Sequence, residues 1–166
     1  MCIRDRAVSA PAQDTTDTTT TEAPTTEAPT TEAPTTEAPV TEAPTSDLGQ
    51  QIANFACQFV GNPYVWGGTS LTNGADCSGF VQSVYKNFGY SLPRTCTPQS
   101  NAGTAVSLAA LAPGDLVFYD HGTGSCEHVG IYIGNGQIVH ASSSRTGIKI
   151  SNVNYSTPFK ACRIVN

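Results

Sequence analysis

The chain has 166 residues, enough for one domain of ordinary size with an appended segment. Its net charge of −5 is uneven: residues 1–47 carry nine acids and two bases, a net of −7, whereas residues 48–166 carry four acids and six bases, a net of +2. A net of +2 without a clustered basic face excludes the footprint of a nucleic-acid-binding domain. No apolar run predicts a membrane-spanning helix.

The first part of the chain is repetitive. Five pentapeptides of the type Thr-Glu-Ala-Pro-Thr fill residues 21–45, and a proline at every fifth position blocks helix and sheet formation. With little apolar surface to bury, residues 1–46 are predicted to be a disordered spacer, whether or not the threonines carry sugars. The stretch 7–10 has the small residues of a signal-peptidase site without the apolar run before it. We therefore expect a truncated signal region of an exported protein, with a cytosolic protein bearing a disordered tail as the alternative.

Residues 47–166 begin with two predicted helices. Asp47 can cap the first helix and Gly61 ends it. The second starts near Cys77, with Asp76 as its N-cap and Gly89 just beyond its end. The apolar stripe that predicts the first helix has four members: Leu48, Ile52, Phe55 and Phe59.

Short apolar runs then predict an antiparallel meander, preceded by a short helix at residues 99–104. The predicted strands cover residues 115–119, 128–133, 137–141, 147–150 and 160–164. Helices followed by strands in this order indicate an α+β domain.

Cys77 is the candidate nucleophile of this domain. At a helix start, unpaired N–H groups and the helix dipole favour its thiolate and could also hold an oxyanion. Gly74, Ser78 and Gly79 surround it with little bulk, as an exposed nucleophile requires. A small buried structural cysteine is the alternative interpretation.

His128 and His140 are the candidate base and orienting group, provided that they share one face of a hairpin. A two-residue turn at Asn135-Gly136 would send them to opposite faces. A three-residue loop at 134–136 would pair Gly130 with His140 and place the histidines as diagonal neighbours. Thiol chemistry therefore predicts the three-residue loop. Val129, Ile131 and Ile133 would then fill the opposite face as core.

These two histidines and Cys77 could instead bind a metal ion. Neither a fourth ligand nor a second shell is evident in the sequence, so we expect no metal site.

Five motifs, taken together, resemble a known family. They are Pro63-Tyr64-Val65-Trp66-Gly67-Gly68, Asp76-Cys77-Ser78-Gly79-Phe80, Leu92-Pro93-Arg94-Thr95, Pro113-Gly114-Asp115-Leu116-Val117-Phe118, and His128-Val129-Gly130-Ile131-Tyr132-Ile133-Gly134 with His140-Ala141. In this order and at this spacing, residues 48–166 resemble the NlpC/P60 family of cell-wall cysteine peptidases. The resemblance implies a papain-like fold, in which N-terminal helices pack on an antiparallel sheet. It also implies hydrolysis of peptidoglycan stem peptides, commonly at the D-γ-glutamyl–diamino-acid bond.

The resemblance assigns roles to individual residues. It makes Cys77 the nucleophile, His128 the base and His140 the third polar member, and it places Tyr64 near the nucleophile, where it helps with the oxyanion. Three more positions match motif residues that line the cleft: Asp76, Ser78 and Arg94.

We therefore expect residues 47–166 to be the catalytic domain of a secreted, cell-wall-associated monomer that acts on peptidoglycan peptides without a cofactor, a nucleic-acid partner or a membrane span. Two alternatives remain. One is a non-catalytic wall-binding domain on the same fold, and the other is an amidase or acyltransferase with the same thiol chemistry.

Four further cysteines are not required by the family: Cys57, Cys96, Cys126 and Cys162. They lack Cys-x-x-Cys spacing, which argues against structural zinc, and their even number suits two disulfides in an oxidising compartment, with buried free thiols as the alternative. Cys96 follows the Arg94-Thr95 loop and Cys126 lies two residues before His128, so both are expected at the rim of the site. We predict a Cys96–Cys126 bond there, and a Cys57–Cys162 bond that joins the first helix to the last strand.

Overall fold

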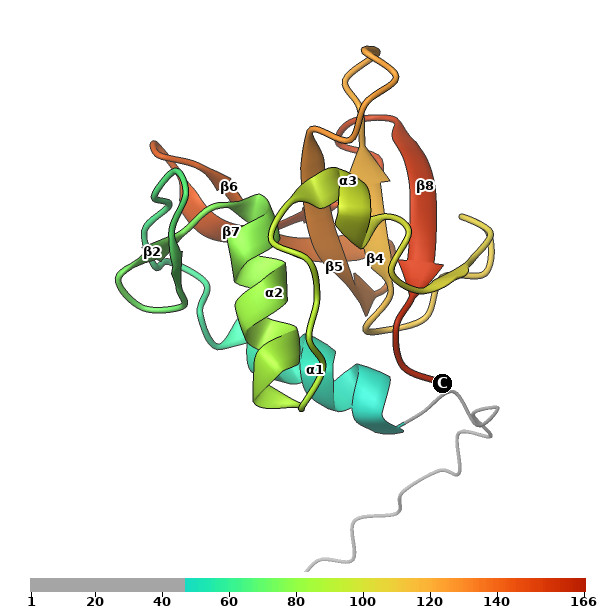
Figure 1. Cartoon of the computed structure of the whole chain (residues 1–166), viewed down its shortest axis with the longest axis horizontal. Coiled ribbons are helices and arrows are strands. Elements are labelled where there is room, and N and C mark those ends of the chain that lie inside the picture. Colours follow the sequence, from blue (N-terminus) through green and yellow to red (C-terminus); the bar gives the residue numbers. More distant parts are fainter. Residues whose placement is uncertain (1–46) are drawn as a thin grey trace, which may run out of the picture. The chain divides into compact units, whose positions relative to one another are not determined.

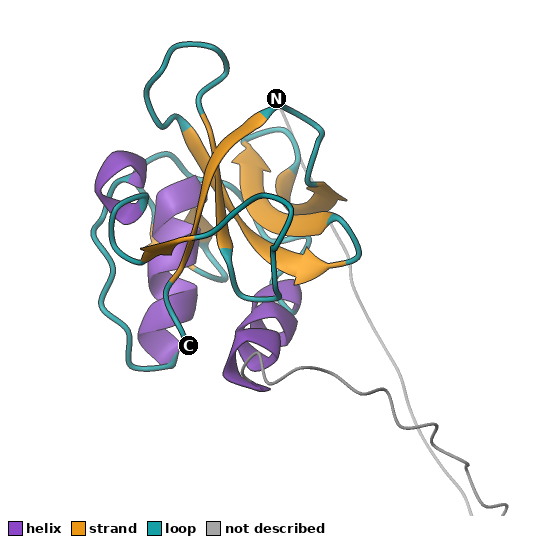
Figure 2. Ribbon diagram, turned by 90° about the vertical axis from the view of Figure 1, so that its right-hand side faces the viewer, coloured by secondary structure: helices purple, strands orange, loops and turns teal. Residues whose placement is uncertain are grey.

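A computed structural model describes residues 47–166, so the spacer predicted at 1–46 lies outside the described residues. Helices and sheet form separate layers, with α2 alongside the sheet (Figures 1 and 2). The helices are α1 (Asp47–Cys57), α2 (Cys77–Asn87) and α3 (Cys96–Gln99). The strands are β1 (Thr69–Ser70), β2 (Gly74–Ala75), β3 (Thr104–Ala105), β4 (Leu116–Tyr119), β5 (His128–Gly134), β6 (Gln137–Ser143), β7 (Gly147–Asn152) and β8 (Pro158–Arg163). The α+β class is confirmed.

The main sheet is antiparallel, with the strand order β3-β8-β4-β5-β6-β7. Strands β4 to β7 form the predicted meander, whereas β8 returns to the other side of β4 and β3 pairs outside it. The meander prediction was therefore wrong for the last strand, because strand spacing along the chain does not reveal such a return. Within residues 47–166, no helix is long and apolar enough to cross a membrane.

The two long helices form for the reasons that the sequence indicates. In α1, Ile52 and Ala56 are fully buried, with Phe55 and Phe59 packed against the same core. In α2, the Asp76 carboxylate caps the first turn by accepting a 2.7 Å hydrogen bond from the Gly79 N–H.

The short helix α3 begins earlier than predicted. It starts at Cys96 after Thr95 and already ends at Gln99, not at 104. Pro98 fits inside its first turn because the N–H groups there have no intrahelical partner. Sequence reasoning treated this proline as a loop residue and placed the helix after it.

The sheet separates an apolar face from a face that carries the histidines. Phe118, Val129 and Ile131 are fully buried in the core beneath α1 and α2, and Ile133 packs against its edge. Tyr119 and His128, which are direct cross-strand partners, point to the other face. The predicted division of β5 into core and site positions is therefore confirmed.

The hairpin that joins β5 to β6 has the predicted register but not the predicted turn. Ile131 faces Val139 and Tyr132 faces Ile138, as the three-residue loop required. However, Gly134 pairs with Gln137, so the turn itself is the two-residue Asn135-Gly136 type with positive φ at both positions (51° and 70°). A bulge at Ile133 adds one residue and restores the register.

The second predicted disulfide is wrong. Among the described cysteines, Cys57 and Cys162 are free thiols: Cys57 packs against the edge of the core, and Cys162 is buried with its sulfur 3.7 Å from the Gln99 carbonyl oxygen. Burial raises the pKa of both thiols, as expected for inert core cysteines. The even number of cysteines therefore misled the sequence argument.

Candidate active site

The loop before α2 brings the candidate nucleophile to the surface. Asp76 accepts hydrogen bonds from the Gly67 and Gly79 N–H groups at 2.9 and 2.7 Å, which ties this loop to the helix start. A Cβ at Gly79 would lie 2.1 Å from the Gly68 carbonyl oxygen, so only glycine permits this close approach. Cys77 is thereby fixed as the first residue of α2 with its side chain partly exposed.

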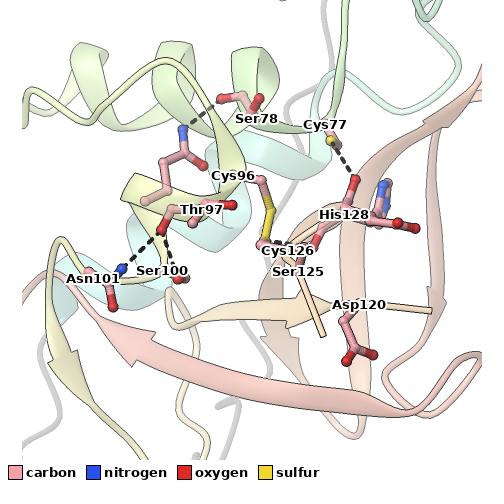
Figure 3. The surroundings of a disulfide bond; sticks show 12 residues. Cys77, Ser78, Cys96, Thr97, Ser100, Asn101, Asp120, Ser125, Cys126 and His128 are labelled. Carbon is pink, nitrogen blue, oxygen red and sulfur yellow. Dashed lines mark hydrogen bonds between the residues drawn. A yellow bond between two sulfur atoms is a disulfide. The ribbon is translucent and has the colours of Figure 1, made fainter. Parts of the chain in front are cut away.

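The Cys77 sulfur lies at the start of β5. It is 4.0 Å from the Glu127 carbonyl oxygen and close to the Val129 N–H, so backbone groups on both sides of His128 surround it. Figure 3 shows the Cys77 side chain pointing to this end of the strand, beside His128. The structure therefore brings the Cys77 sulfur to the start of the strand that carries His128, fifty-one positions further along the sequence.

The thiol is less acidic than its position at a helix start predicts. Burial raises the pKa of Cys77, and the Asp76 carboxylate raises it further. The N–H groups of Val129, Ser78 and Cys77 itself lower it but do not outweigh the burial. Cys77 consequently needs a nearby base to remove its proton.

The two candidate histidines are hydrogen-bonded to each other. His128 Nε2 lies 2.6 Å from His140 Nδ1, and His140 Nε2 lies 2.9 Å from the Ser151 hydroxyl. Gly130 makes room for His140, since a Cβ there would lie 3.3 Å from the His140 Cβ. The prediction that the two rings share one face is confirmed.

One set of tautomers that fits the hydrogen-bond chain leaves a basic nitrogen on His128. When His140 donates its Nε2–H to Ser151, its Nδ1 accepts, and His128 must then carry its proton on Nε2. This arrangement leaves His128 Nδ1 as the free, basic nitrogen. The chain of contacts therefore orients a proton acceptor.

Both imidazoles are neutral at neutral pH. Burial lowers the pKa of His128 to about 4, with a further contribution from His121. Burial lowers the pKa of His140 to about 3, helped by His128 and Lys149. A neutral His128 can accept the proton of a thiol.

A charged network supports the opposite side of the nucleophile. Arg94 donates to both Asp76 carboxylate oxygens, at 2.9 and 2.6 Å, and to the Ser78 hydroxyl at 3.0 Å. Although burial opposes it, this guanidinium with the Gly67 and Gly79 N–H groups holds the pKa of Asp76 below its usual range. Asp76, Ser78 and Arg94 are brought together as predicted, with their polar groups engaged mainly with one another.

A cleft of about 730 Å³ opens beside Cys77. The Cys96–Cys126 disulfide, predicted from the sequence, forms part of its wall and joins α3 to the residues before β5 (Figure 3). The lining residues are Trp66, Gly67, Asp76, Cys77, Ser78, Arg94, Thr95, Cys96, Thr97, Cys126 and Glu127.

Tyr64 lies near the nucleophile, outside the cleft lining. It forms a parallel bridge with Ala75, and burial together with the nearby Cys77 raises its pKa. Its predicted oxyanion role stays a prediction.

Sequence reasoning missed three residues around the histidines. Ser151 could have been found from the register between β6 and β7. His140 pairs directly with Lys149, so Ser151, two residues further along β7, is the diagonal neighbour of His140 on the same face. His121 and Tyr155 come from loops whose positions no sequence pattern indicates; their rings lie 6.5 and 6.4 Å from that of His128. In the described part of the chain, no group of three or more His, Cys, Asp or Glu side chains is arranged to hold a metal ion.

Comparison with known proteins gives a consistent result. A model of the NlpC/P60 family matches residues 61–165. The gamma-D-glutamyl-L-lysine dipeptidyl-peptidase of Bacillus cereus is 42% identical over 105 residues, covering 62% of this chain and 31% of that protein. The gamma-DL-glutamyl hydrolase of Bacillus subtilis is 47% identical over 111 residues, covering 66% of this chain and 26% of that protein.

The crystal structure of the NlpC/p60 domain of the peptidoglycan hydrolase SagA superposes with a TM-score of 0.64 at 36% identity, covering 69% of this chain and 97% of that one. The chain spans less than a third of the length of each of the two curated relatives, so the similarity concerns only a part of each. The family model nevertheless covers well over half of the chain. The chain belongs to the NlpC/P60 family.

Proposed function

We propose that this chain is a secreted cysteine endopeptidase that hydrolyses peptidoglycan stem peptides, at the bond between γ-D-glutamate and the diamino acid. One observation carries the proposal: Cys77 lies at the strand end that holds His128, and His128 is hydrogen-bonded through Nε2 to His140. A thiol, a base and an orienting group beside an open cleft are the equipment of a cysteine hydrolase.

The first half of the reaction forms a thioester. His128 Nδ1 takes the Cys77 proton as the sulfur attacks the scissile carbonyl carbon. The resulting imidazolium is stabilised by its Nε2–H bond to His140. The N–H groups of Cys77 and Ser78, which lie beside the sulfur, are placed to hold the oxyanion. The imidazolium then protonates the leaving amine, and the C–N bond breaks.

The second half regenerates the enzyme. His128, neutral again, removes a proton from a water molecule that attacks the thioester carbonyl. The C–S bond breaks, the thiolate recovers its proton from His128, and the peptide leaves with a new carboxyl group. No step requires a metal ion or an organic cofactor.

The choice of bond is supported by the relatives. Two of them are named for action on γ-glutamyl linkages, and a third is named a peptidoglycan hydrolase. The open cleft, whose lining includes Cys77 and the exposed indole of Trp66, has room for a peptide beside the sulfur. Secretion is supported by the Cys96–Cys126 disulfide, since such bonds persist in oxidising compartments.

Product identification from a panel of defined muropeptides tests the proposal. We expect mass spectrometry to detect cleavage after γ-D-glutamate, with a newly exposed amine on the diamino acid. Cys77→Ala should abolish product formation, whereas Cys57→Ala, which removes another free thiol outside the cleft, should leave it unchanged.

Other outcomes identify the alternatives. Binding to peptidoglycan that persists in Cys77→Ala, without any product from the unaltered chain, would indicate a wall-binding domain. Hydrolysis of an amide bond other than one within the stem peptide would indicate an amidase. Transfer of the acyl group to an added amine would indicate an acyltransferase.

A further inference from the structure

Tyr155 belongs to the loop between β7 and β8, far in sequence from every motif of the site. Its ring centroid lies 5.1 Å from that of His140, 6.4 Å from that of His128 and 5.0 Å from that of Tyr119. The ring therefore touches both imidazoles of the proposed catalytic pair, and Tyr155 remains 43% exposed. It lies between the histidines and solvent.

The histidines are unusually well covered for groups that take part in proton transfer. His140 is fully buried and His128 is 8% exposed. Beneath the rings the sheet supplies Gly130, which has no side chain, and Tyr119, which is the cross-strand partner of His128. The remaining cover has to come from outside the sheet. The His121 and Tyr155 rings both lie there beside His128, and the Tyr155 ring also packs against His140.

The loop around Tyr155 is anchored on several sides. The Tyr119 hydroxyl donates a 2.8 Å hydrogen bond to the Val153 carbonyl, and the Tyr155 N–H donates to the Asn152 carbonyl at 3.0 Å. Ser156 lies 3.3 Å from a His121 ring nitrogen. The position of the ring is therefore built into the fold.

The same segment also touches the far nitrogen of the histidine pair. Ser151, four residues before Tyr155, is hydrogen-bonded to His140 Nε2. One stretch of chain, residues 151–156, thus contacts His140 both at its outer nitrogen and across its ring face. These two contacts limit rotation of the ring.

We propose that Tyr155 is a positioning residue whose ring excludes water from the His128–His140 pair and so keeps His128 in the neutral, proton-accepting form. The proposal deepens the proposed function and rests on it. The contacts of Tyr155 with the two imidazoles are ring packing.

Other groups around the pair also bear on its protonation. They are Cys77 from α2, Glu127 at the start of β5, Tyr119 from β4, His121 from the β4–β5 loop and Lys149 from β7. Each is left in place by a substitution at Tyr155, so a change caused by that substitution reports on the ring itself.

The direction of the effect follows from burial, the largest cause of the lowered pKa of both histidines. Removing the ring admits water and moves the pKa of His128 from about 4 toward its ordinary value near 6.5. Were the shift complete, the neutral fraction at pH 5.5 would fall about tenfold, with little change at pH 8.

The test is an NMR titration of the histidines in the full chain carrying Cys77→Ala, which needs no turnover. The chain has three histidines, so His121→Gln identifies the His121 signal and leaves the two signals of the His128–His140 pair. We expect Tyr155→Ala to raise both remaining titration midpoints by at least one unit. Tyr155→Phe and the control Phe159→Ala, which removes a ring of similar exposure (41%) outside the cluster, should leave them unchanged.

Equal midpoints in Tyr155→Ala and the parent would overturn the proposal, as would an equal shift in Tyr155→Phe. If Tyr155→Ala loses its circular dichroism signal, Tyr155→Gln serves instead, because it keeps a long side chain without the ring, and the same criteria apply to it.

Activity measured with the Cys77 protein provides the second readout. Tyr155→Ala should lose kcat/KM at pH 5.5 far more than at pH 8, whereas Tyr155→Phe should follow the parent at both values. An inactive parent would refute the proposed function, yet the titration would still decide the role of the ring.

Discussion

The two sides of the cleft are stabilised by different forces. On the Cys77 side, Asp76 and Arg94 form a bidentate ion pair that also caps α2 and engages Ser78. On the histidine side the two imidazoles are themselves neutral at neutral pH, and His128 and His140 are held by burial, one mutual hydrogen bond and aromatic neighbours. The comparison teaches that substitutions of Asp76 and Arg94, which support the nucleophile, should act mainly through stability, and substitutions of the two histidines mainly through chemistry.

Apart from loss of the nucleophile Cys77 itself, the largest effect is expected on the histidine side. His128→Ala removes the proton acceptor and should lower kcat/KM about 10³-fold, the range of a general base. His140→Ala should cost less, because the acceptor remains and only its orientation is lost. Steady-state kinetics on a muropeptide, with circular dichroism as a check of folding, measures both. A His140 variant more damaged than the His128 variant would reverse the assigned roles.

The disulfide links the two sides covalently, since Cys96 belongs to α3 and Cys126 lies just before β5. Replacing both cysteines by alanine should lower the free energy of unfolding by about 3.6 kcal/mol, because the bond closes a loop of 30 residues. Urea denaturation measures the change. Cys57→Ala is the matched control, and an equally large loss there would mean that the disulfide contributes nothing special.

On the nucleophile side, Asp76→Ala removes the cap of α2 and leaves Arg94 without its partner. We expect the free energy of unfolding to fall by about 2 kcal/mol. Asp76→Asn, which can still accept the Gly79 N–H, should lose less. Since the pKa of Asp76 is lowered in the folded state, its contribution is present above the unfolded pKa near 4 and is lost as the pH falls through the folded value. If the free energy of unfolding of Asp76→Asn depended on pH in the same way as that of the parent, this contribution of Asp76 would be contradicted.

On acidification, protonation of the histidines should begin to lower the free energy of unfolding at a higher pH than protonation of Asp76 does. Both have folded pKa values below the ordinary 6.5, so the unfolded chain binds more protons and stability falls as the pH drops from about 6.5 toward 4. Unfolding free energies between pH 8 and 4 measure the slope. His140→Gln should flatten it, and an unchanged slope would show that the pair is not responsible.

The smallest effect is expected at the end of the hydrogen-bond chain. Ser151→Ala removes the partner of His140 Nε2, a contact worth about 1 kcal/mol, and should lower kcat about fivefold. Ser151→Thr keeps the hydroxyl and should stay close to the parent. If both variants match the parent, the hydroxyl does not fix the tautomer.

Local features of the site could be predicted from the sequence, and features that depend on distant contacts could not. The Asp76 carboxylate caps α2 by accepting from the Gly79 N–H, which lies only three residues further along the chain, so the local sequence alone indicates the contact. The shared face of His128 and His140 was also predictable, but only on the assumption that both histidines serve the Cys77 thiol. The turn came out differently, because a bulge and a three-residue loop give the same register.

The remaining errors have a common physical origin. Tyr155 reaches the histidines through a loop anchored by Tyr119, and no periodicity encodes that packing. The return of β8 to β4, and the separation of Cys57 from Cys162, likewise depend on how elements distant in sequence meet. A count of cysteines gives their number and says nothing about where their side chains meet.

The bulge at Ile133 has a consequence for how this hairpin can evolve. Deleting that one residue, with the tight turn kept, would rotate the inner part of β5 by half a turn relative to β6, bury the imidazole of His128 among aliphatic side chains and expose Val129. Insertions and deletions at the tip of this hairpin should therefore involve two residues at a time, or be accompanied by the gain or loss of a β-bulge nearby. The extra residue at the bulge therefore keeps the histidines on one face of the hairpin and the aliphatic side chains on the other.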